Sequence, residues 1–168
     1  NWHIVDTQWI SGHAKKVVNK MNRLKIEQVF SMIRNGVTIK QGVKDGIPIT
    51  RIESISNGYL DQNKFGYVGV DDENKYKNYI LKEDDILMSH INSEKHLGKT
   101  AIYINARYPI IHGMNLLCLR AIRRQLFPKY AFYYFRGSDF KRQISKITKK
   151  SVNQASFSIT GLKQITIP

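Results

Sequence analysis

The chain has 168 residues, with 27 Lys and Arg against 13 Asp and Glu, a formal net charge of +14 and a single cysteine. This length suits one domain with a sizeable core, and 42% hydrophobic with 24% charged residues excludes wholesale disorder. The apolar runs are too short to span a bilayer, the first residues lack a signal-peptide pattern, and Cys118 has no partner for an internal disulfide. We therefore expect an intracellular, cytoplasmic protein.

The positive charge is concentrated in the C-terminal half. Residues 91–168 carry fourteen basic and two acidic groups, whereas residues 61–90 carry four basic and seven acidic groups. A domain with an isoelectric point of about 9.9 and clustered Lys and Arg attracts polyanions, among which nucleic acid is the commonest. An anionic membrane is disfavoured because no lipidation signal or long basic amphipathic helix is present. An acidic protein partner, or a surface that only aids solubility, remains an alternative.

The first part of the chain contains a helical pattern followed by an alternating one. Residues 1–23 are interpreted as an N-terminal leader or short helix. Between 24 and 34, apolar residues recur at helical spacing, which predicts a helix ended by Asn35-Gly36. From 46 to 55, apolar and polar residues alternate, which predicts a half-buried strand with a register change near Arg51. Asn57-Gly58 then signals a turn.

The middle of the chain reads as strands joined by polar segments. Residues 61–79 are acidic and glycine-spotted, which predicts a long surface loop or an irregular hairpin. An acidic turn leads into a predicted strand at 86–89, and two further strands are predicted over 98–104 and 115–120. The polar segment 90–97 is predicted to be a connecting loop.

Two helices are predicted near the C-terminus. Pro128 suits the first turn of one helix, and Ser138 is expected to cap the next. In the second helix, Phe140, Ile144 and Ile147 share one face. The opposite side is uniformly positive and carries Lys141, Arg142, Lys146 and Lys149.

Catalytic motifs are sparse in the sequence. The four prolines are isolated, which excludes the Pro-Pro-aromatic loop of an amino-methylating enzyme, and no Gly-rich nucleotide-binding turn is present. Gly98-Lys99-Thr100 resembles the end of a phosphate-binding loop, but Ser93 stands where the first glycine is required. A metal-dependent nuclease is the alternative enzyme reading, with loosely spaced candidates in Asp61, Glu73 and Lys75 or in His90, His96 and His112.

Several motifs occur in a fixed order along the chain. The first is the segment 24–30, and the second is an I-P-x-x-R-x-x-x-I strand within 46–55. An L-K-x-x-D-I-L-x-S strand at 81–89 and the segment 98–102 follow. The last is the segment 151–159, which runs into a terminal I-x-I-P within 162–168. This succession resembles a target recognition domain of a type I restriction-modification system specificity subunit, over residues 24–168. Fused type II restriction-methylation enzymes use similar recognition domains, so the parent system stays open.

The resemblance implies a fold, a role and partners. The implied fold is α+β, a single domain with a twisted mixed, largely antiparallel β-sheet flanked by helices. The implied role is non-catalytic reading of one half of a bipartite double-stranded DNA target in a prokaryotic cytoplasm. The partners would be a modification (methyltransferase) subunit, a restriction subunit, and a second recognition domain or dimer partner. The domain would hold no cofactor, because S-adenosylmethionine, ATP and Mg would belong to the partner subunits.

Candidate DNA contacts follow from side-chain chemistry and loop position. The base-reading candidates lie in three loops and comprise Arg51, Ser54, Ser56, Asn57, Tyr59, Ser89, His90, Asn92, Ser93, Lys95, His96, Asn153 and Gln154. The phosphate candidates are Lys99, Lys141, Arg142, Lys146, Lys149 and Lys150.

Each assignment has a structural alternative. Arg51 could brace the sheet through Glu53 or Asp85, the second loop could be a silent turn, and Asn153 and Gln154 could cap backbone groups. The aromatic cluster at 130–135 is predicted to be core rather than a stacking platform. A single-stranded or RNA-binding module also fits the charge, although the usual aromatic strand motifs are absent.

Overall fold

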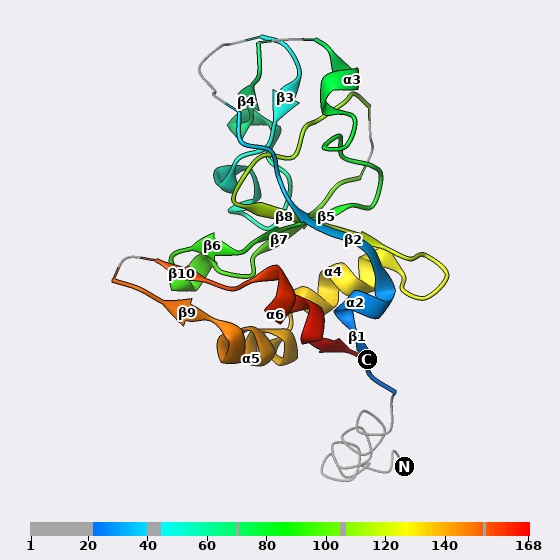
Figure 1. The fold of residues 1–168 in the computed structure, drawn as a ribbon, viewed down its shortest axis with the longest axis vertical. Coiled ribbons are helices and arrows are strands. Elements are labelled where there is room, and N and C mark those ends of the chain that lie inside the picture. Colours follow the sequence, from blue (N-terminus) through cyan, green and yellow to red (C-terminus); the bar gives the residue numbers. More distant parts are fainter. Residues whose placement is uncertain (1–21, 40–44, 70, 105–106, 153) are drawn as a thin grey trace, which may run out of the picture.

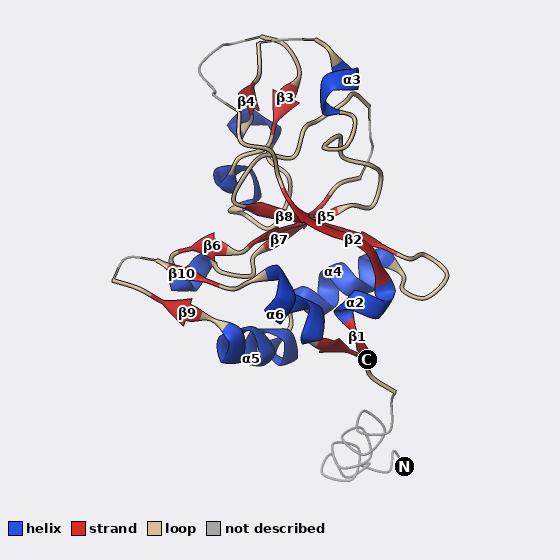
Figure 2. Ribbon diagram, viewed as in Figure 1, coloured by secondary structure: helices blue, strands red, loops and turns tan. Residues whose placement is uncertain are grey.

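The structure is a computed structural model that describes residues 22–39, 45–69, 71–104, 107–152 and 154–168. Its centre is a four-stranded antiparallel sheet (Figures 1 and 2). The strands follow the order β2 (Phe30–Asn35), β8 (Leu116–Ala121), β5 (Ile86–Ser89) and β7 (Thr100–Ile102). Helices cover one side of this sheet and an irregular lobe covers the other (Figure 2), so the predicted α+β fold class is confirmed.

The central strands bury both faces, which explains their nearly continuous apolar sequence. Along β5, Ile86 and Met88 pack toward the helices, whereas Leu87 packs toward the lobe. Along β8, Leu117 and Leu119 share the helical side. This alternation follows from the two-residue period of a strand and yields two hydrophobic clusters separated by the sheet.

The helical layer consists of α2 (Ile26–Val29), α4 (Pro128–Arg136), α5 (Ser138–Ile147) and α6 (Ile159–Gln164). Pro128 occupies the first turn of α4, as predicted. Phe135 of α4 and Phe140 of α5 are each 1% exposed, and their ring centroids lie 4.7 Å apart. The two helices therefore pack on each other through aromatic side chains that the sheet also covers, which places the basic face of α5 outward.

The lobe on the other side contains short elements only. They are β3 (Pro48–Ile49), which pairs with β4 (Gly66–Tyr67), the 3₁₀ turns η1 (Ile52–Ile55) and η2 (Gln62–Lys64), and α3 (Glu73–Tyr76). Ile49 and Ile111 are fully buried and anchor a third hydrophobic cluster beneath these turns. The lobe carries η1, from which the first predicted loop extends.

Two small sheets complete the fold. In the first, β10 (Ala155–Ser156) lies between β6 (Ile91–Asn92) and β9 (Lys149–Lys150), and the 3₁₀ turn η3 (Glu94–His96) follows β6. In the second, β1 (Leu24–Lys25) pairs with β11 (Thr166–Ile167). The first sheet brings the second and third predicted loops together, and Figure 1 shows it projecting beside α5.

A polar cluster joins the two ends of the described domain. Arg23 Nη2 lies 2.6 Å from a carboxylate oxygen of Asp139 and donates to the carbonyl oxygen of Thr166 at 2.9 Å. The Tyr134 hydroxyl lies 2.8 Å from the same Asp139 oxygen, and Gln143 accepts from the Thr166 N–H at 3.1 Å. Side chains from α4 and α5 therefore bind both Arg23, which directly precedes β1, and Thr166 of β11.

A buried ion pair fixes the turn before β5. The Asp85 side chain is fully buried, and Arg120 donates to both its oxygens at 2.7 and 2.6 Å. The backbone N–H of Lys82 donates to the same carboxylate at 2.8 Å. The predicted acidic turn is thus a structural feature in which Asp85 pairs with Arg120 of β8.

The helix predicted over 24–34 is wrong beyond Val29. Only Ile26–Val29 is helical, and Phe30–Asn35 forms strand β2 with a register shift between Phe30 and Met32. This bulge puts Phe30 and Ile33 on the same side of the sheet although they are three residues apart. The apolar residues of the bulged strand are therefore spaced as they would be in a helix.

The strand predicted over 46–55 is also too long. Extended pairing stops after Ile49, and Ile52–Ile55 forms the turn η1. Ser54 causes this bend locally, because its hydroxyl accepts the backbone N–H of Arg51 at 2.9 Å. The predicted turn after η1 is present.

The structure differs from the predicted elements in three smaller ways. Gly137, not Ser138, occupies the capping position of α5, and Ser138 is its first helical residue. The segment 61–79 contains η2, β4 and α3, and the loop 90–97 contains β6 and η3.

The strands predicted near 86–89, 98–104 and 115–120 are confirmed. The leader predicted at 1–23 lies outside the described residues except for its last two positions. None of the described helices has the length and apolar character needed to cross a membrane.

Candidate nucleic-acid interface

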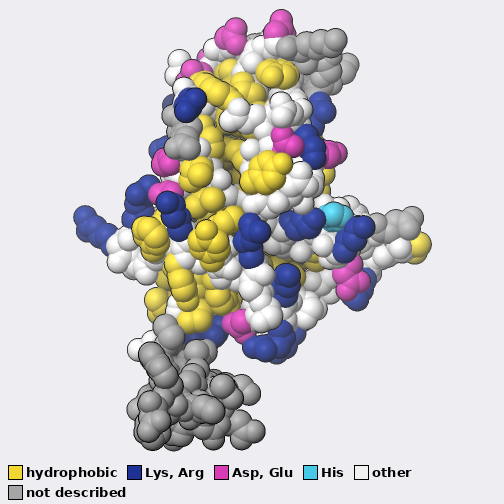
Figure 3. Space-filling view, turned by 180° about the vertical axis from the view of Figure 1, so that it is seen from behind, with side chains coloured by type: hydrophobic (Ala, Val, Ile, Leu, Met, Phe, Trp, Pro, Cys, Tyr) yellow, Lys and Arg dark blue, Asp and Glu magenta, His cyan; other side chains and the backbone are white. Residues whose placement is uncertain are grey.

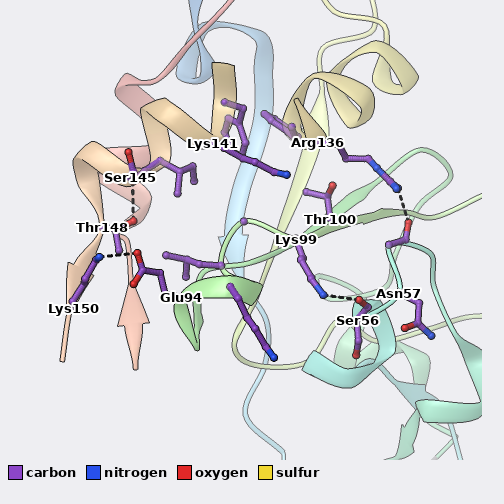
Figure 4. A pocket seen from close by; sticks show the side chains of 17 residues that line it. Ser56, Asn57, Glu94, Lys99, Thr100, Arg136, Lys141, Ser145, Thr148 and Lys150 are labelled. Carbon is purple, nitrogen blue, oxygen red and sulfur yellow. Dashed lines mark hydrogen bonds and ion pairs between the residues drawn. The ribbon is translucent and has the colours of Figure 1, made fainter. Parts of the chain in front are cut away.

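A cleft of about 660 Å³ opens where helices α4 and α5 face the loops after η1 and around η3 (Figure 4). Its floor is apolar and includes Phe135, Phe140 and Ile144, which also belong to the core. Its rim is polar and receives side chains from all three predicted loops. The predicted residues that line it are Ser56, Asn57, Lys95, Lys99, Lys141 and Lys150.

The rim of the cleft is strongly basic. Five cationic side chains are among the described residues that line it, namely Lys95, Lys99, Arg136, Lys141 and Lys150. The same lining contains one carboxylate, that of Glu94. In Figure 4 these cations come from opposite walls, with Arg136 and Lys141 on the helices and Lys99 on the sheet side. Like charges held around one concave surface raise the local positive potential, which favours an anionic ligand.

Backbone carbonyls hold two of these cations in place. Lys99 Nζ donates to the carbonyl oxygen of Ser56 at 3.0 Å, and Arg136 donates to that of Gly58 at 3.0 Å. The Arg136 guanidinium also stacks over the Phe132 ring at 5.1 Å. Because a carbonyl carries no net charge, both side chains keep their full positive charge while they position the loop after η1.

A smaller pocket of about 170 Å³ adjoins the cleft and shares Ser56 and Lys99 with it. Asn92 and His96 also line it. Partial burial, followed by the nearby charges of Lys99 and Lys95, lowers the pKa of His96. A neutral imidazole has one donor and one acceptor nitrogen, so His96 can match either kind of group on a base edge.

Two predicted base-reading serines are buried instead of exposed. Ser54 is fully buried and caps η1 through Arg51, and Ser89 is 1% exposed within β5. Ser89 also accepts from the Asn92 side chain at 3.3 Å. Both hydroxyls are engaged inside the fold, because a buried polar group requires an internal partner. The structure therefore does not present Ser54 or Ser89 to a ligand.

His90 is likewise an interior residue. It is 6% exposed, and its ring meets Phe157 edge-on at 6.3 Å between centroids. Burial lowers the pKa of His90, which keeps the ring neutral. The backbone carbonyl of His90 accepts from the Phe157 N–H at 3.1 Å, so this residue joins β6 to β10 rather than facing outward.

The remaining loop candidates are accessible. Arg51, Ser93 and Gln154 are exposed, and Tyr59 is 58% exposed. The Asn57 side chain lies 3.4 Å from the Tyr59 hydroxyl, which places two candidates side by side. Asn153 lies outside the described residues.

The basic face of α5 is divided among several environments. Lys141 lines the cleft and Lys146 is exposed farther along the helix. Arg142 forms an ion pair with Asp139, so that part of its charge is compensated. Lys149 belongs to β9 rather than to the helix, and it is exposed.

Sequence reasoning missed two residues that line the cleft, and it also left out one exposed residue of the third loop. Arg136 was hidden within the aromatic run of α4, and Glu94 was overlooked because its neighbours are basic. Val152 is 98% exposed beyond β9. A projection of α4 would have placed Arg136 with the outward residues, whereas the position of Glu94 depends on the tertiary pairing of β6 with β10.

The residues considered for a nuclease do not form a site in the described structure. Asp61 accepts the N–H of Asn63 at 3.1 Å and caps η2, and Glu73 is exposed on α3. His112 is 1% exposed and packs against Tyr79. Over the described ranges, no three His, Cys, Asp or Glu residues are grouped so that they could hold a metal ion.

The charge is also uneven on the molecular surface. Figure 3 shows many Lys and Arg side chains across the middle and lower part of one face with a few carboxylates among them, and it shows carboxylates at the upper end, where the lobe with α3 lies. This distribution agrees with the uneven charge along the sequence, because residues 61–90 build much of that lobe.

Comparisons with known proteins agree on one family. A model of the type I restriction modification DNA specificity domain matches residues 19–168. The putative type I restriction enzyme MjaX specificity subunit of Methanocaldococcus jannaschii is 43% identical over 145 residues, which is 86% of this chain and 34% of that protein. The type I restriction enzyme EcoKI specificity subunit of Escherichia coli is 22% identical over 143 residues, 84% of this chain and 31% of that protein.

A solved structure supports the fold. It comes from work on complex assembly and conformational transition of the type I R-M system. The match covers 96% of this chain and 39% of the chain in that structure, with a TM-score of 0.62 and 15% sequence identity. This chain spans about a third of the length of the curated relatives that it matches. The ordered motifs, the fold and the family match agree, and the chain belongs to the type I restriction modification DNA specificity domain family.

Proposed function

We propose that this domain reads a short sequence of double-stranded DNA, as a non-catalytic specificity component of a restriction-modification complex. The observation that carries the proposal is the cleft, because side chains from three separate segments meet around it and five of them are cationic. The family membership supports the same reading.

Affinity and sequence choice come from different parts of this surface. Exposed lysines, such as Lys141 and Lys146, bind phosphates and give an affinity that falls steeply with salt. Asn57, His96 and Gln154 have the donors and acceptors that match base edges in the major groove. The β9–β10 pair beside the cleft belongs to the three-stranded sheet with β6, and its outer strand presents the exposed Lys149 and Lys150.

The wider assembly is part of the proposal. Because the chain covers about a third of its relatives, we infer that a second recognition domain reads the other half of the target. A methyltransferase subunit and a restriction subunit would supply chemistry. S-adenosylmethionine, ATP and Mg would then bind to those subunits, and this domain would need none of them to bind DNA.

The proposal can be tested with the purified chain and labelled oligonucleotides. Duplex binding should weaken as salt rises, should exceed binding to single strands of the same sequence, and should leave the DNA intact in Mg²⁺. Metal-dependent cleavage would instead support the nuclease alternative. A preference for single-stranded DNA or RNA would contradict duplex reading.

A further inference from the structure

Glu94 is an anomaly in the basic cleft. It is one of two acidic residues between 91 and 168, the other being Asp139. Among the described residues that line the cleft, it is the one with a carboxylate. A carboxylate repels phosphate, so its presence on a DNA-facing surface lowers non-specific affinity unless it gains a contact there.

Two features place Glu94 at the edge of the cleft. It is the first residue of η3, directly after Ser93, and Lys150 of β9 donates to its carboxylate at 2.7 Å. In Figure 4 this pair lies at one end of the pocket, where η3 meets β9. The Glu94 side chain is nevertheless 65% exposed, so the carboxylate keeps acceptor sites free for a ligand.

Base-edge chemistry restricts what such a carboxylate can contact. In the major groove, cytosine presents an amino donor without an acceptor on the same base. Adenine presents its amino group beside the N7 acceptor, which repels a carboxylate, and guanine and thymine present acceptors. A carboxylate that accepts hydrogen bonds therefore selects cytosine.

We propose that Glu94 accepts a hydrogen bond from the N4 amino group of one cytosine in the target, with Lys150 as the residue that positions its carboxylate. The inference rests on the proposed function, because it requires duplex DNA in this cleft. Glu94 is then a specificity-determining residue, which lowers the affinity for other sequences and raises the affinity for the target that contains the cytosine.

The experiment compares the chain with its Glu94→Gln variant in selections from a random duplex pool. The unmodified chain should enrich a motif that contains a C·G pair. The variant, whose side-chain amide has both a donor and an acceptor and so also matches the N6 and N7 groups of adenine, should no longer select cytosine over adenine at that position alone. On a defined duplex, the discrimination at this pair should fall by about tenfold. Glu73→Gln, which alters an exposed carboxylate on α3, is the control and should leave the motif unchanged.

A modified base separates a direct contact from an indirect one. Replacing that cytosine with pyrimidin-2-one, which lacks the N4 amino group, should weaken binding by the unmodified chain. The same replacement should weaken binding by Glu94→Gln less, because a neutral amide oxygen is a weaker acceptor than a carboxylate. The same increase in affinity for every duplex would show that Glu94 only repels phosphate, and would overturn the inference. A uniform loss of affinity together with a lower melting temperature would assign Glu94 to holding β9, and would also overturn it. Failure of the unmodified chain to enrich any motif would overturn the proposed function itself.

Discussion

Lys141 and Lys146 provide the cleanest residue-scale test of phosphate contact. Both are exposed on α5, and among the described residues neither has an ion-pair partner within the usual distance. Lys141→Ala with Lys146→Ala should weaken binding to all duplexes and reduce the slope of log affinity against log salt by about 2. The measurement is fluorescence anisotropy over a series of salt concentrations.

The matched control removes the same charge from another surface. Lys77→Ala with Lys82→Ala alters two exposed lysines of the lobe, outside the described lining of the cleft. This variant should keep the original salt slope. A slope that does not change with the α5 pair would remove that face from the interface.

Arg120 is predicted to matter for stability rather than for DNA binding. Removing it by Arg120→Leu leaves the Asp85 carboxylate buried without its cation, which typically costs about 3–5 kcal/mol. Urea unfolding should show this loss. Arg123→Ala breaks a pair whose arginine is 65% exposed, so it should change the unfolding free energy by at most about 1 kcal/mol. Similar losses for both would contradict the structural role assigned to Asp85.

At the element scale, the backbone between η1 and α4 positions the first loop. Gly58 has a φ of +78°, and a Cβ added there would lie 3.1 Å from an Arg136 nitrogen. Gly58→Ala should therefore cost about 1–2 kcal/mol of stability and also weaken duplex binding, because it disturbs the cation that borders the cleft.

Gly69 offers a control with the same backbone strain. Its φ is +69°, but it lies on the lobe and is not among the residues that line the cleft. Gly69→Ala should lose similar stability in thermal unfolding and keep its DNA affinity at a temperature where both variants are folded. Equal binding losses would mean that strain alone explains the effect of Gly58→Ala.

The elements also show where sequence reasoning succeeds. The strands β5, β7 and β8 were predictable because their apolar residues are local signals of burial. The strand β2 was not, because its bulge places Phe30 and Ile33 on one side and so reproduces helical spacing. Pairing with β8 decides the conformation there, and that partner is distant in the sequence.

In the candidate site, too, some features could be predicted from the sequence and others could not. The residue types of the three loops were visible in the sequence, and their approach around one cleft is consistent with the predicted grouping. Burial of Ser54, Ser89 and His90 was not visible, because it depends on turns and strand pairs formed with remote segments. The Glu94–Lys150 pair has the same origin.

At the scale of the whole molecule, Asp139 links the ends of the described domain to the helices. Burial opposes ionisation, but hydrogen bonds from Tyr134 and Arg23 outweigh it and lower the pKa of Asp139. A lowered carboxylate pKa stabilises the fold above the unfolded value of about 3.9, and this contribution is lost as the pH falls through the folded pKa.

Asp139→Asn should therefore reduce stability most at neutral pH. The expected loss is on the order of 1 kcal/mol, because the ion pair with Arg23 is about one-third exposed and is screened by solvent. The difference between the two proteins should shrink as the pH falls below about 4. Unfolding free energies measured from pH 3 to 7 would show this, and a difference independent of pH would contradict it.

The most direct test of the central claim is selection from a random duplex pool with the unmodified chain at near-physiological salt, followed by sequencing. A domain that reads half of a bipartite target should enrich one short contiguous motif. Salt-sensitive binding without any enrichment would contradict that account, because it would show that the basic cleft holds DNA without reading its sequence.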